Sequence, residues 1–215
     1  MPDGDRRIDV FGDVSAPCRT LARRDPALKV ALKAIGRPHI RRRPGGFEGL
    51  FRIIVEQQVS VPSAQAILAR CNAGLPDVSP EAVLETGEAG LKGLGLSTPK
   101  ARYILALAER VRAGELSLED LGAHDDERAS SVLQALKGVG PWTAGIYLLF
   151  CEGRLDIWPP GDVALQAAYG AAAGLDGKIE ARLLDEAALG WAPWRGLAAH
   201  ILWTYYAHLR GRQPI

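Results

Sequence analysis

The sequence is poor in cysteine, and its few cysteines stand far apart. They are Cys18, Cys71 and Cys151. Structural zinc sites and iron–sulfur clusters are bound by closely spaced cysteines, so this spacing excludes both kinds of site and favours buried, unreactive thiols. The four histidines, His39, His124, His200 and His208, share no spacing typical of a metal site. We therefore expect no iron–sulfur cluster and no metal held by side chains.

Long apolar runs and a targeting signal are also absent. No stretch approaches about 18 consecutive apolar residues, the length that a membrane-spanning helix needs. Residues 1–7 carry acidic residues before a basic pair, and no apolar run follows them, so we expect no signal peptide. These observations predict no membrane partner and a cytoplasmic protein, associated with the nucleoid if its source is bacterial.

The chain has almost no net charge. Its 26 Lys and Arg against 25 Asp and Glu give +1, which by itself argues neither for nor against a nucleic-acid partner. With 215 residues, of which 47% are hydrophobic and 24% charged, the composition is that of an ordinary globular protein. The length indicates one large domain or two closely packed lobes.

Helix signals recur from Asp25 to the end of the chain, whereas strand signals are almost absent. Asp25-Pro26, Ser79-Pro80 and Thr98-Pro99 each pair a capping residue with a proline at the first helical position. Only residues 8–14 alternate as a strand would. We predict an all-α protein of about nine or ten helices joined by short turns.

An apolar stripe predicts a helix over residues 47–59. The residues that recur at helical spacing are Phe47, Leu50, Phe51, Ile54, Val55 and Val59. Gln58 lies on the same face, where a polar amide is either hydrogen-bonded inside the core or directed into a cleft. The sequence leaves both interpretations of Gln58 open.

Residues 136–144, Leu-Lys-Gly-Val-Gly-Pro-Trp-Thr-Ala, predict a tight hairpin between two helices. Gly138 and Gly140 permit a turn too tight for side chains, while Val139 anchors it inward. Because the turn leads into a helix that starts at Pro141, its glycine N–H groups are suited to bind a phosphate without regard to base sequence. A plain interhelical turn is the alternative. A weak echo at residues 91–95 does not amount to a repeat protein.

Several sequence blocks in combination resemble the helix-hairpin-helix (HhH-GPD) DNA glycosylase superfamily, and most closely its alkylbase branch, DNA-3-methyladenine glycosylase II. The blocks are Phe47-Glu48-Gly49-Leu50 with Glu56-Gln57-Gln58-Val59-Ser60-Val61, Gly138-Val139-Gly140-Pro141-Trp142-Thr143-Ala144, Pro160-Gly161-Asp162, and Trp191-Ala192-Pro193-Trp194-Arg195 through His200-Ile201-Leu202-Trp203. They occur in the family's order with similar spacings, and they extend over about residues 25–209.

This resemblance implies a two-lobed all-α fold with DNA lying across an interlobe cleft. We expect residues 1–24 to be an N-terminal extension and residues 25–215 to be the glycosylase core. The central hairpin lobe is expected at about residues 62–155, and the second lobe at about 25–61 together with 156–215.

Asp162 stands at an expected helix start, directly after Pro-Pro-Gly. There the helix dipole and backbone N–H groups favour an ionised carboxylate. The plain reading is a helix cap, since Asp is a favoured capping residue. The resemblance implies that Asp162 is the catalytic residue, because one ionised carboxylate stabilises a positively charged sugar and a cationic leaving base needs no general acid. Asp156 is interpreted as a loop residue that makes hydrogen bonds.

Trp142 and Trp203 match positions of the family's base pocket, so the resemblance implies that they stack on an extruded base. Where the family has a pocket tyrosine, this chain has Ile146 with Tyr147 beside it, which leaves the shape of the pocket open. Lyase members of the superfamily carry a nucleophilic lysine at the position of Trp142. The resemblance therefore implies a monofunctional glycosylase without lyase activity.

The last helix is expected over about residues 193–209, with tryptophans on opposite faces. Trp194 shares a face with Leu197, Ile201 and Tyr205, which indicates core. Trp203 shares a face with His200 and Ala207, which suits a cleft.

Three further roles are implied by the resemblance. Gln58 matches the residue that enters the gap left by the extruded base, with a core glutamine as the alternative. The hairpin residues Gly138, Val139, Gly140 and Thr143 would bind DNA phosphate. A structural Na⁺ or K⁺ would lie at the hairpin carbonyls near Gly138 and Gly140. Arg41, Arg42, Arg43, Arg210 and Arg212 are expected at phosphates or, more simply, on a solvated surface.

The function implied by the resemblance is base excision repair of alkylated DNA. We expect a monomer without cofactor that hydrolyses the N-glycosidic bond of 3-methyladenine and then 7-methylguanine in duplex DNA. One alternative is a glycosylase for hypoxanthine or another deaminated base, and another is a noncatalytic damage-sensing module. Because the net charge is only +1, DNA binding is expected on one face and with a shallow salt dependence.

Overall fold

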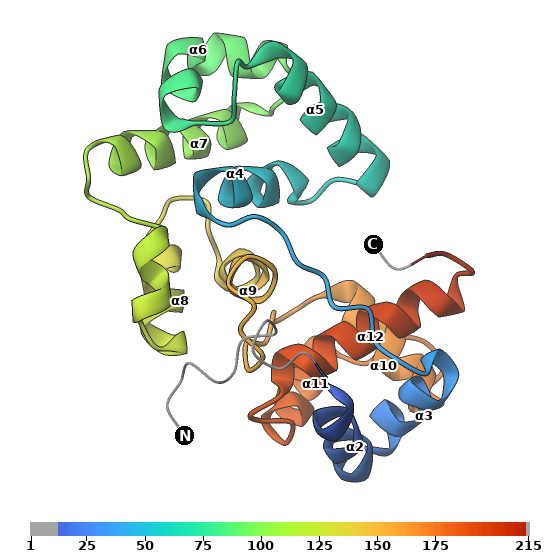
Figure 1. Ribbon diagram of the computed structural model, residues 1–215. Coiled ribbons are helices and arrows are strands. Elements are labelled where there is room, and N and C mark those ends of the chain that lie inside the picture. Colours follow the sequence, from blue (N-terminus) through green and yellow to red (C-terminus); the bar gives the residue numbers. More distant parts are fainter. Residues whose placement is uncertain (1–12, 214–215) are drawn as a thin grey trace. The chain divides into compact units, whose positions relative to one another are not determined.

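The computed structural model describes residues 13–213, and every regular element in that range is a helix (Figure 1). The elements are α2 (Ser15–Arg24), α3 (Pro26–Ile35), α4 (Gly46–Glu56), α5 (Val61–Gly74), α6 (Pro80–Gly93), α7 (Thr98–Arg112), the 3-10 helix η2 (Glu119–Ala123), α8 (Asp126–Gln134), α9 (Pro141–Phe150), α10 (Val163–Ala172), α11 (Ala181–Leu189) and α12 (Arg195–Leu209). The all-α prediction is confirmed. The strand-like alternation at residues 8–14 falls almost entirely outside the described residues.

The described range holds more helices than the sequence indicates, because α2 and α11 have weak start signals. The N-caps of these helices are Val14 and Glu180, and neither side chain bonds to the backbone of the first turn. The stronger start signals are confirmed, since the side chains of Asp25, Ser79 and Asp162 all accept backbone N–H bonds at helix starts.

Three expected helix boundaries are wrong. The helix predicted over residues 47–59 ends at Glu56, so Gln58 lies beyond it in a turn. The last helix starts at Arg195, and Trp194 is its N-cap rather than a member of a helical face. α7 is capped by Ser97 instead of Thr98, without a side-chain bond.

The chain divides into two compact units. Among the described residues, unit 1 comprises residues 13–42 and 148–213, and unit 2 comprises residues 43–147. These bounds differ from the lobes expected from the sequence, because α4 packs against α5 and α7 and therefore belongs with the hairpin in unit 2. Likewise α2 packs against α3, so residues 15–24 are an integral part of unit 1.

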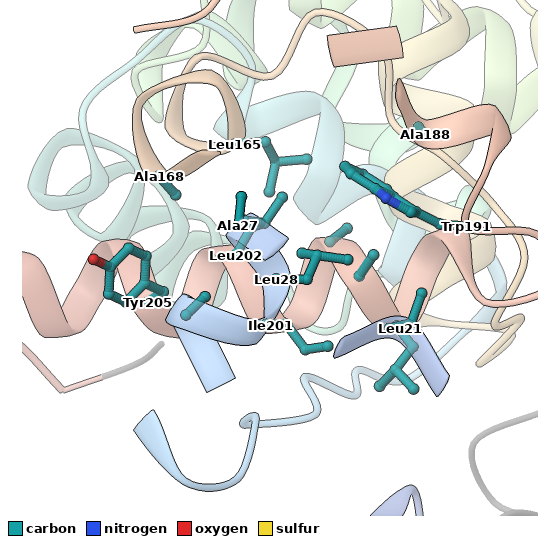
Figure 2. Close-up of a cluster of buried hydrophobic side chains, with 14 of the residues drawn as sticks. Leu21, Ala27, Leu28, Leu165, Ala168, Ala188, Trp191, Ile201, Leu202 and Tyr205 are labelled. Carbon is teal, nitrogen blue, oxygen red and sulfur yellow. The ribbon is translucent and has the colours of Figure 1, made fainter. Parts of the chain in front are cut away.

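Unit 1 is built around α12, whose apolar side chains meet those of α3 and α10. Figure 2 shows Leu28, Leu165, Leu202 and Trp191 within this core. A buried carboxylate joins the elements: Asp25 Oδ2 accepts the indole N–H of Trp191 at 2.9 Å and the hydroxyl of Tyr169 at 3.2 Å. The other oxygen, Oδ1, caps α3.

Unit 2 is built from α4 to α8 and most of α9, with α6 and α7 lying side by side (Figure 1). Its core contains side chains that are fully buried, among them Leu50, Phe51, Ile54, Leu91 and Ile104. None of the helices in residues 13–213 has both the length and the hydrophobicity of a membrane span.

All three cysteines are buried and free, as the sequence predicts. Burial raises the pKa of the Cys18 thiol to about 11 and also raises the pKa of Cys71. Thiols in such surroundings stay protonated and unreactive.

Candidate DNA-repair site

The hairpin lies in unit 2 between α8 and α9. Gly138 has a φ of 85°, and a Cβ there would lie 2.2 Å from Cδ2 of Tyr103, so only glycine fits. Val139 is buried and anchors the turn, and its N–H bonds to the carbonyl of Leu136 at 3.1 Å. Gly140 is exposed at the start of α9. The hairpin predicted from the two glycines is present, with an open surface at Gly140.

Thr143, also expected to bind phosphate, is turned inward. Its side chain is only 4% exposed, and its hydroxyl accepts the side-chain amide of Gln57 at 2.8 Å. The same amide donates to the carbonyl of Gly138 at 3.0 Å. The structure therefore uses Thr143 to join the hairpin to the turn after α4.

That turn presents Gln58 at the surface. Gln58 is exposed and has a φ of 52°, the one positive φ of a non-glycine residue in the described chain. Of the two interpretations left open by the sequence, burial in the core is wrong. Gln58 therefore has the exposure that the implied role in the base gap requires.

Sequence reasoning missed the residues that hold this turn. The ammonium group of Lys100 donates to the carbonyl of Val55 at 2.7 Å and to that of Gln57 at 2.6 Å. Both carbonyls lie at the C-terminal end of α4, where a cation is favourable. Partial burial lowers the pKa of Lys100. Lys100 carries no sequence signal for this role, since it follows Gln57 by 43 residues and its partners lie at the end of another helix.

The pocket residues of unit 2 differ in exposure. Trp142 is half-buried, whereas Ile146 is 4% exposed and belongs to the packed interior. Tyr147 beside it is fully buried, and its hydroxyl accepts the N–H of Gly46 at 2.9 Å. Tyr147 thus fixes the start of α4 from inside the unit.

In unit 1, Asp162 is the N-cap of α10. Its Oδ1 accepts the N–H of Leu165 at 3.0 Å and the indole N–H of Trp203 at 3.3 Å. Gly161 has a φ of 73°, a conformation that favours glycine, and it lies directly before the Asp162 cap. The cap and the indole together hold a half-buried carboxylate in a fixed orientation.

Trp203 belongs to a cluster of rings with Phe150 and His200. The Trp203 ring lies 5.4 Å from that of Phe150 and 5.8 Å from that of His200, edge-on to the latter. The guanidinium of Arg41 lies over Phe150 at 4.9 Å. These contacts restrict how the Trp203 indole can turn, and part of that indole stays exposed.

His200 does not face a cleft, contrary to the expectation from the helical face. It is 1% exposed, and burial, followed by the positive charges nearby, lowers its pKa to about 3. Its Nδ1 accepts the N–H of Arg41 over 3.5 Å, while Nε2 has no hydrogen-bond partner among residues 13–213. His200 is therefore a neutral packing residue behind Trp203.

Asp156 has the role expected of a loop residue. Its carboxylate receives two bonds from the Arg195 guanidinium, each of 3.0 Å, and the Arg195 N–H at 3.1 Å. Asp156 is 6% exposed, so it fixes the start of α12.

The basic residues expected at phosphates already have contacts within the protein. Arg43 makes a bidentate ion pair with Glu56, at 2.6 and 2.9 Å, and Arg210 lies over the ring of Tyr206 at 4.5 Å. Arg210 is exposed, as a solvated surface residue would be, whereas the Arg43 side chain is only 14% exposed in its ion pair.

No group of three or more metal-binding side chains occurs in the part of the chain that the structure describes. A cation at the hairpin would instead rely on backbone oxygens. The Gly138 carbonyl accepts Gln57 and the Gly140 carbonyl accepts the N–H of Ala144. Each oxygen keeps a second lone pair of the hard type that Na⁺ or K⁺ prefers, so the donor set fits and the cation stays a prediction.

Comparisons with known proteins agree with this arrangement. A relative from Schizosaccharomyces pombe, "Alkylbase DNA glycosidase-like protein mag2", is 28% identical over 77% of this chain and 79% of its own. A relative from Mycobacterium tuberculosis, "Probable bifunctional transcriptional activator/DNA repair enzyme AlkA", is 30% identical over 97% of this chain. This chain spans 43% of that longer protein.

Solved structures show the same fold. The 3-methyladenine DNA glycosylase Mag1 of S. pombe, in complex with abasic DNA, has a TM-score of 0.80 at 22% identity and covers 88% of this chain and 96% of its own. The DNA-3-methyladenine glycosidase of Bacillus halodurans has a TM-score of 0.70 at 27% identity, covering 88% and 93%. The family model described as "HhH-GPD superfamily base excision DNA repair protein" matches residues 51–193, and the chain belongs to this superfamily.

Proposed function

We propose that the protein is a DNA glycosylase that releases alkylated purines, 3-methyladenine first and 7-methylguanine second, from duplex DNA. It hydrolyses the N-glycosidic bond and leaves an abasic site in an uncut strand. Family membership and the names of the relatives support glycosylase activity on alkylated bases. The order of preference between the two bases, and action as a monomer, belong to the proposal alone.

The observation that carries the mechanism is the pair formed by Asp162 and Trp203 in unit 1. Departure of the base leaves an oxocarbenium-like sugar, which a fixed carboxylate stabilises without having to reorient. Asp162 is such a carboxylate, held by the Leu165 N–H and the Trp203 indole N–H. Water then attacks the sugar and completes the hydrolysis.

The same pair suits a cationic base. N-alkylation gives the purine a positive charge, so it leaves without a proton from a general acid. The electron-rich face of an indole attracts cations, and Trp203 is half-buried with part of its ring exposed. The base must first leave the duplex, at a cost of about a few kcal/mol, and an exposed Gln58 supports a role in filling its place.

No residue proposed for catalysis is an amine. Position 142, where lyase members carry lysine, is Trp142, so no Schiff base with the sugar forms there. We therefore propose hydrolysis without strand cleavage.

The proposal is tested by incubating the protein with methylated duplex DNA and separating the products. We expect free 3-methyladenine and 7-methylguanine by mass spectrometry, with strands that break only after alkaline treatment. A duplex containing hypoxanthine is the matched comparison. Release of hypoxanthine alone would assign the activity to deaminated bases, binding without release would indicate a damage sensor, and direct strand cleavage would contradict the hydrolytic mechanism.

A further inference from the structure

The turn after α4, residues 57–60, combines an exposed tip with an unusual backbone. Gln58 has a φ of 52°, which a residue with a side chain adopts only when its surroundings impose it. Its neighbour Val59 is 38% exposed, and Ser60 is the N-cap of α5. The tip is therefore exposed and does not belong to the core of unit 2.

Two side chains fix the turn from behind. Gln57 reaches from the turn to the hairpin, where its amide donates to the carbonyl of Gly138 and to the hydroxyl of Thr143. Lys100, from α7, donates to the carbonyls of Val55 and Gln57. Four hydrogen bonds of 2.6 to 3.0 Å thus determine where the Gln58 backbone stands.

These bonds also connect the turn to the hairpin. The Gly138 carbonyl belongs to the same peptide chain segment that presents Gly140 at the start of α9. Thr143, the second acceptor of the Gln57 amide, is buried in α9, so it gives the turn an anchor inside the packed unit. Hydrogen bonds therefore join the Gln58 turn directly to the exposed hairpin within unit 2.

We propose that Gln57 and Lys100 are positioning residues that hold Gln58 for insertion into the gap left by an extruded base. The inference rests on the proposed function, since it assumes that a base leaves the duplex. A tip that is already ordered loses little conformational entropy on insertion, so its anchors contribute most to binding when a gap is present. Intact duplex offers no gap, so it gains only from the support that Gln57 gives to the hairpin.

The test is a double-mutant cycle between Gln57→Met and Gln58→Ala, with Lys100→Met and Lys100→Arg as a second pair. Gln57→Met keeps the length of the side chain and removes its amide. Gln134→Met, an exposed glutamine on α8, is the matched control. The dissociation constant is measured for a duplex with a tetrahydrofuran abasic analogue and for the same duplex intact, after thermal unfolding has established that each variant is folded.

We expect Gln57→Met to weaken binding of the abasic duplex about tenfold, as the loss of hydrogen bonds to an ordered element would. Binding of the intact duplex should weaken much less, because only the support of the hairpin is lost there. In the Gln58→Ala background the further effect of Gln57→Met should nearly vanish, because the anchored residue is gone. Lys100→Arg should retain more abasic-site affinity than Lys100→Met. Equal losses on both duplexes, or additive effects in the cycle, would overturn the proposal.

A second readout is single-turnover release of the base from a paired lesion and from the same lesion in an unpaired bulge. Positioning residues for insertion should affect the paired lesion more. If the wild type releases no base but the binding cycle behaves as expected, the proposed function fails and the positioning role stands. If the wild type releases base and the cycle is additive, the proposed function stands and the positioning role of Gln57 fails.

Discussion

The two hairpin glycines give a prediction that separates folding from DNA binding. Alanine at Gly138 would place a Cβ 2.2 Å from the Tyr103 ring, at a φ of 85°. Alanine at Gly140 would meet no heavy atom within 4 Å, and the φ there is not positive. The first substitution should disturb the unit, whereas the second should place a methyl group on the exposed surface and leave the fold intact.

The expected magnitudes follow from these contacts. A left-handed conformation costs an alanine about 1–2 kcal/mol, and overpacking costs about 1–3 kcal/mol. Gly138→Ala should therefore lower the free energy of unfolding by about 2–5 kcal/mol. Gly140→Ala should change it by less than about 0.5 kcal/mol. Alanine keeps the backbone N–H of Gly140, but its methyl group would hold a phosphate away from that donor. If the N–H contacts phosphate, loss of this bond to a charged group weakens DNA binding about tenfold or more.

Urea unfolding measures the free energy of unfolding of both variants, and fluorescence anisotropy with a short duplex measures their affinity for DNA. Tyr103→Ala in the Gly138→Ala background should give a double mutant about 1–3 kcal/mol more stable than the sum of the two single effects predicts. The second substitution removes the clash with the Tyr103 ring but leaves the backbone strain of a positive φ. Wild-type stability of Gly138→Ala would refute the packing argument. Wild-type affinity of a folded Gly140→Ala would refute contact between the hairpin surface and phosphate.

Three further predictions concern unit 1. Asp25→Ala should lower the free energy of unfolding by about 3 kcal/mol relative to Asp25→Asn, because it removes a helix cap and leaves the buried Trp191 N–H unpaired; chemical denaturation measures the difference. Burial, and then the charge of Asp25, raises the pKa of Tyr169 to about 12. The unfolded chain loses this phenolic proton first, near pH 10, so stability should be fully present below about pH 10 and fall as pH rises toward 12. Tyr169→Phe should remove that part of the alkaline loss, and an unchanged pH profile of unfolding would count against it. Asp156→Asn should lower stability by breaking the pair with Arg195, yet leave single-turnover base release within about threefold in molecules that remain folded; a loss of a hundredfold would give Asp156 a direct catalytic role.

Local signals in the sequence predicted the starts of α3, α6 and α10 because each depends on a capping residue and the next few N–H groups. Asp162 shows the limit of such local signals. Its role as a helix cap could be predicted, but its hydrogen bond from the Trp203 indole could not, since 41 residues separate donor and acceptor. The same limit explains the early end of α4. Its apolar stripe continues to Val59, and the carbonyls at its end are taken by Lys100, which comes 45 residues after Val55.

The candidate site follows the same rule. The two glycines predicted the hairpin, because a positive φ at Gly138 depends on the residue type itself and not on distant parts of the chain. Burial was harder to predict. The resemblance implies a phosphate contact for Thr143, and the helical face shared with Trp203 suggests a cleft for His200, yet both side chains are buried. The sequence could not distinguish Gln57 from Gln58, since the two residues are identical. They differ only in the fold, where the Gln57 amide meets the Gly138 carbonyl and the Thr143 hydroxyl.

In the proposed mechanism the charge of Asp162 drives departure of the base, and the Asp162→Asn variant tests this role most directly. Asn is as good an N-cap as Asp, so α10 and the fold should be preserved while the negative charge is lost. Single-turnover release of 3-methyladenine from methylated duplex should fall by about 10²–10³-fold, the size of a lost electrostatic contact to a developing charge. Affinity for the abasic duplex should fall far less. Release at the wild-type rate by a folded Asp162→Asn protein would contradict the account.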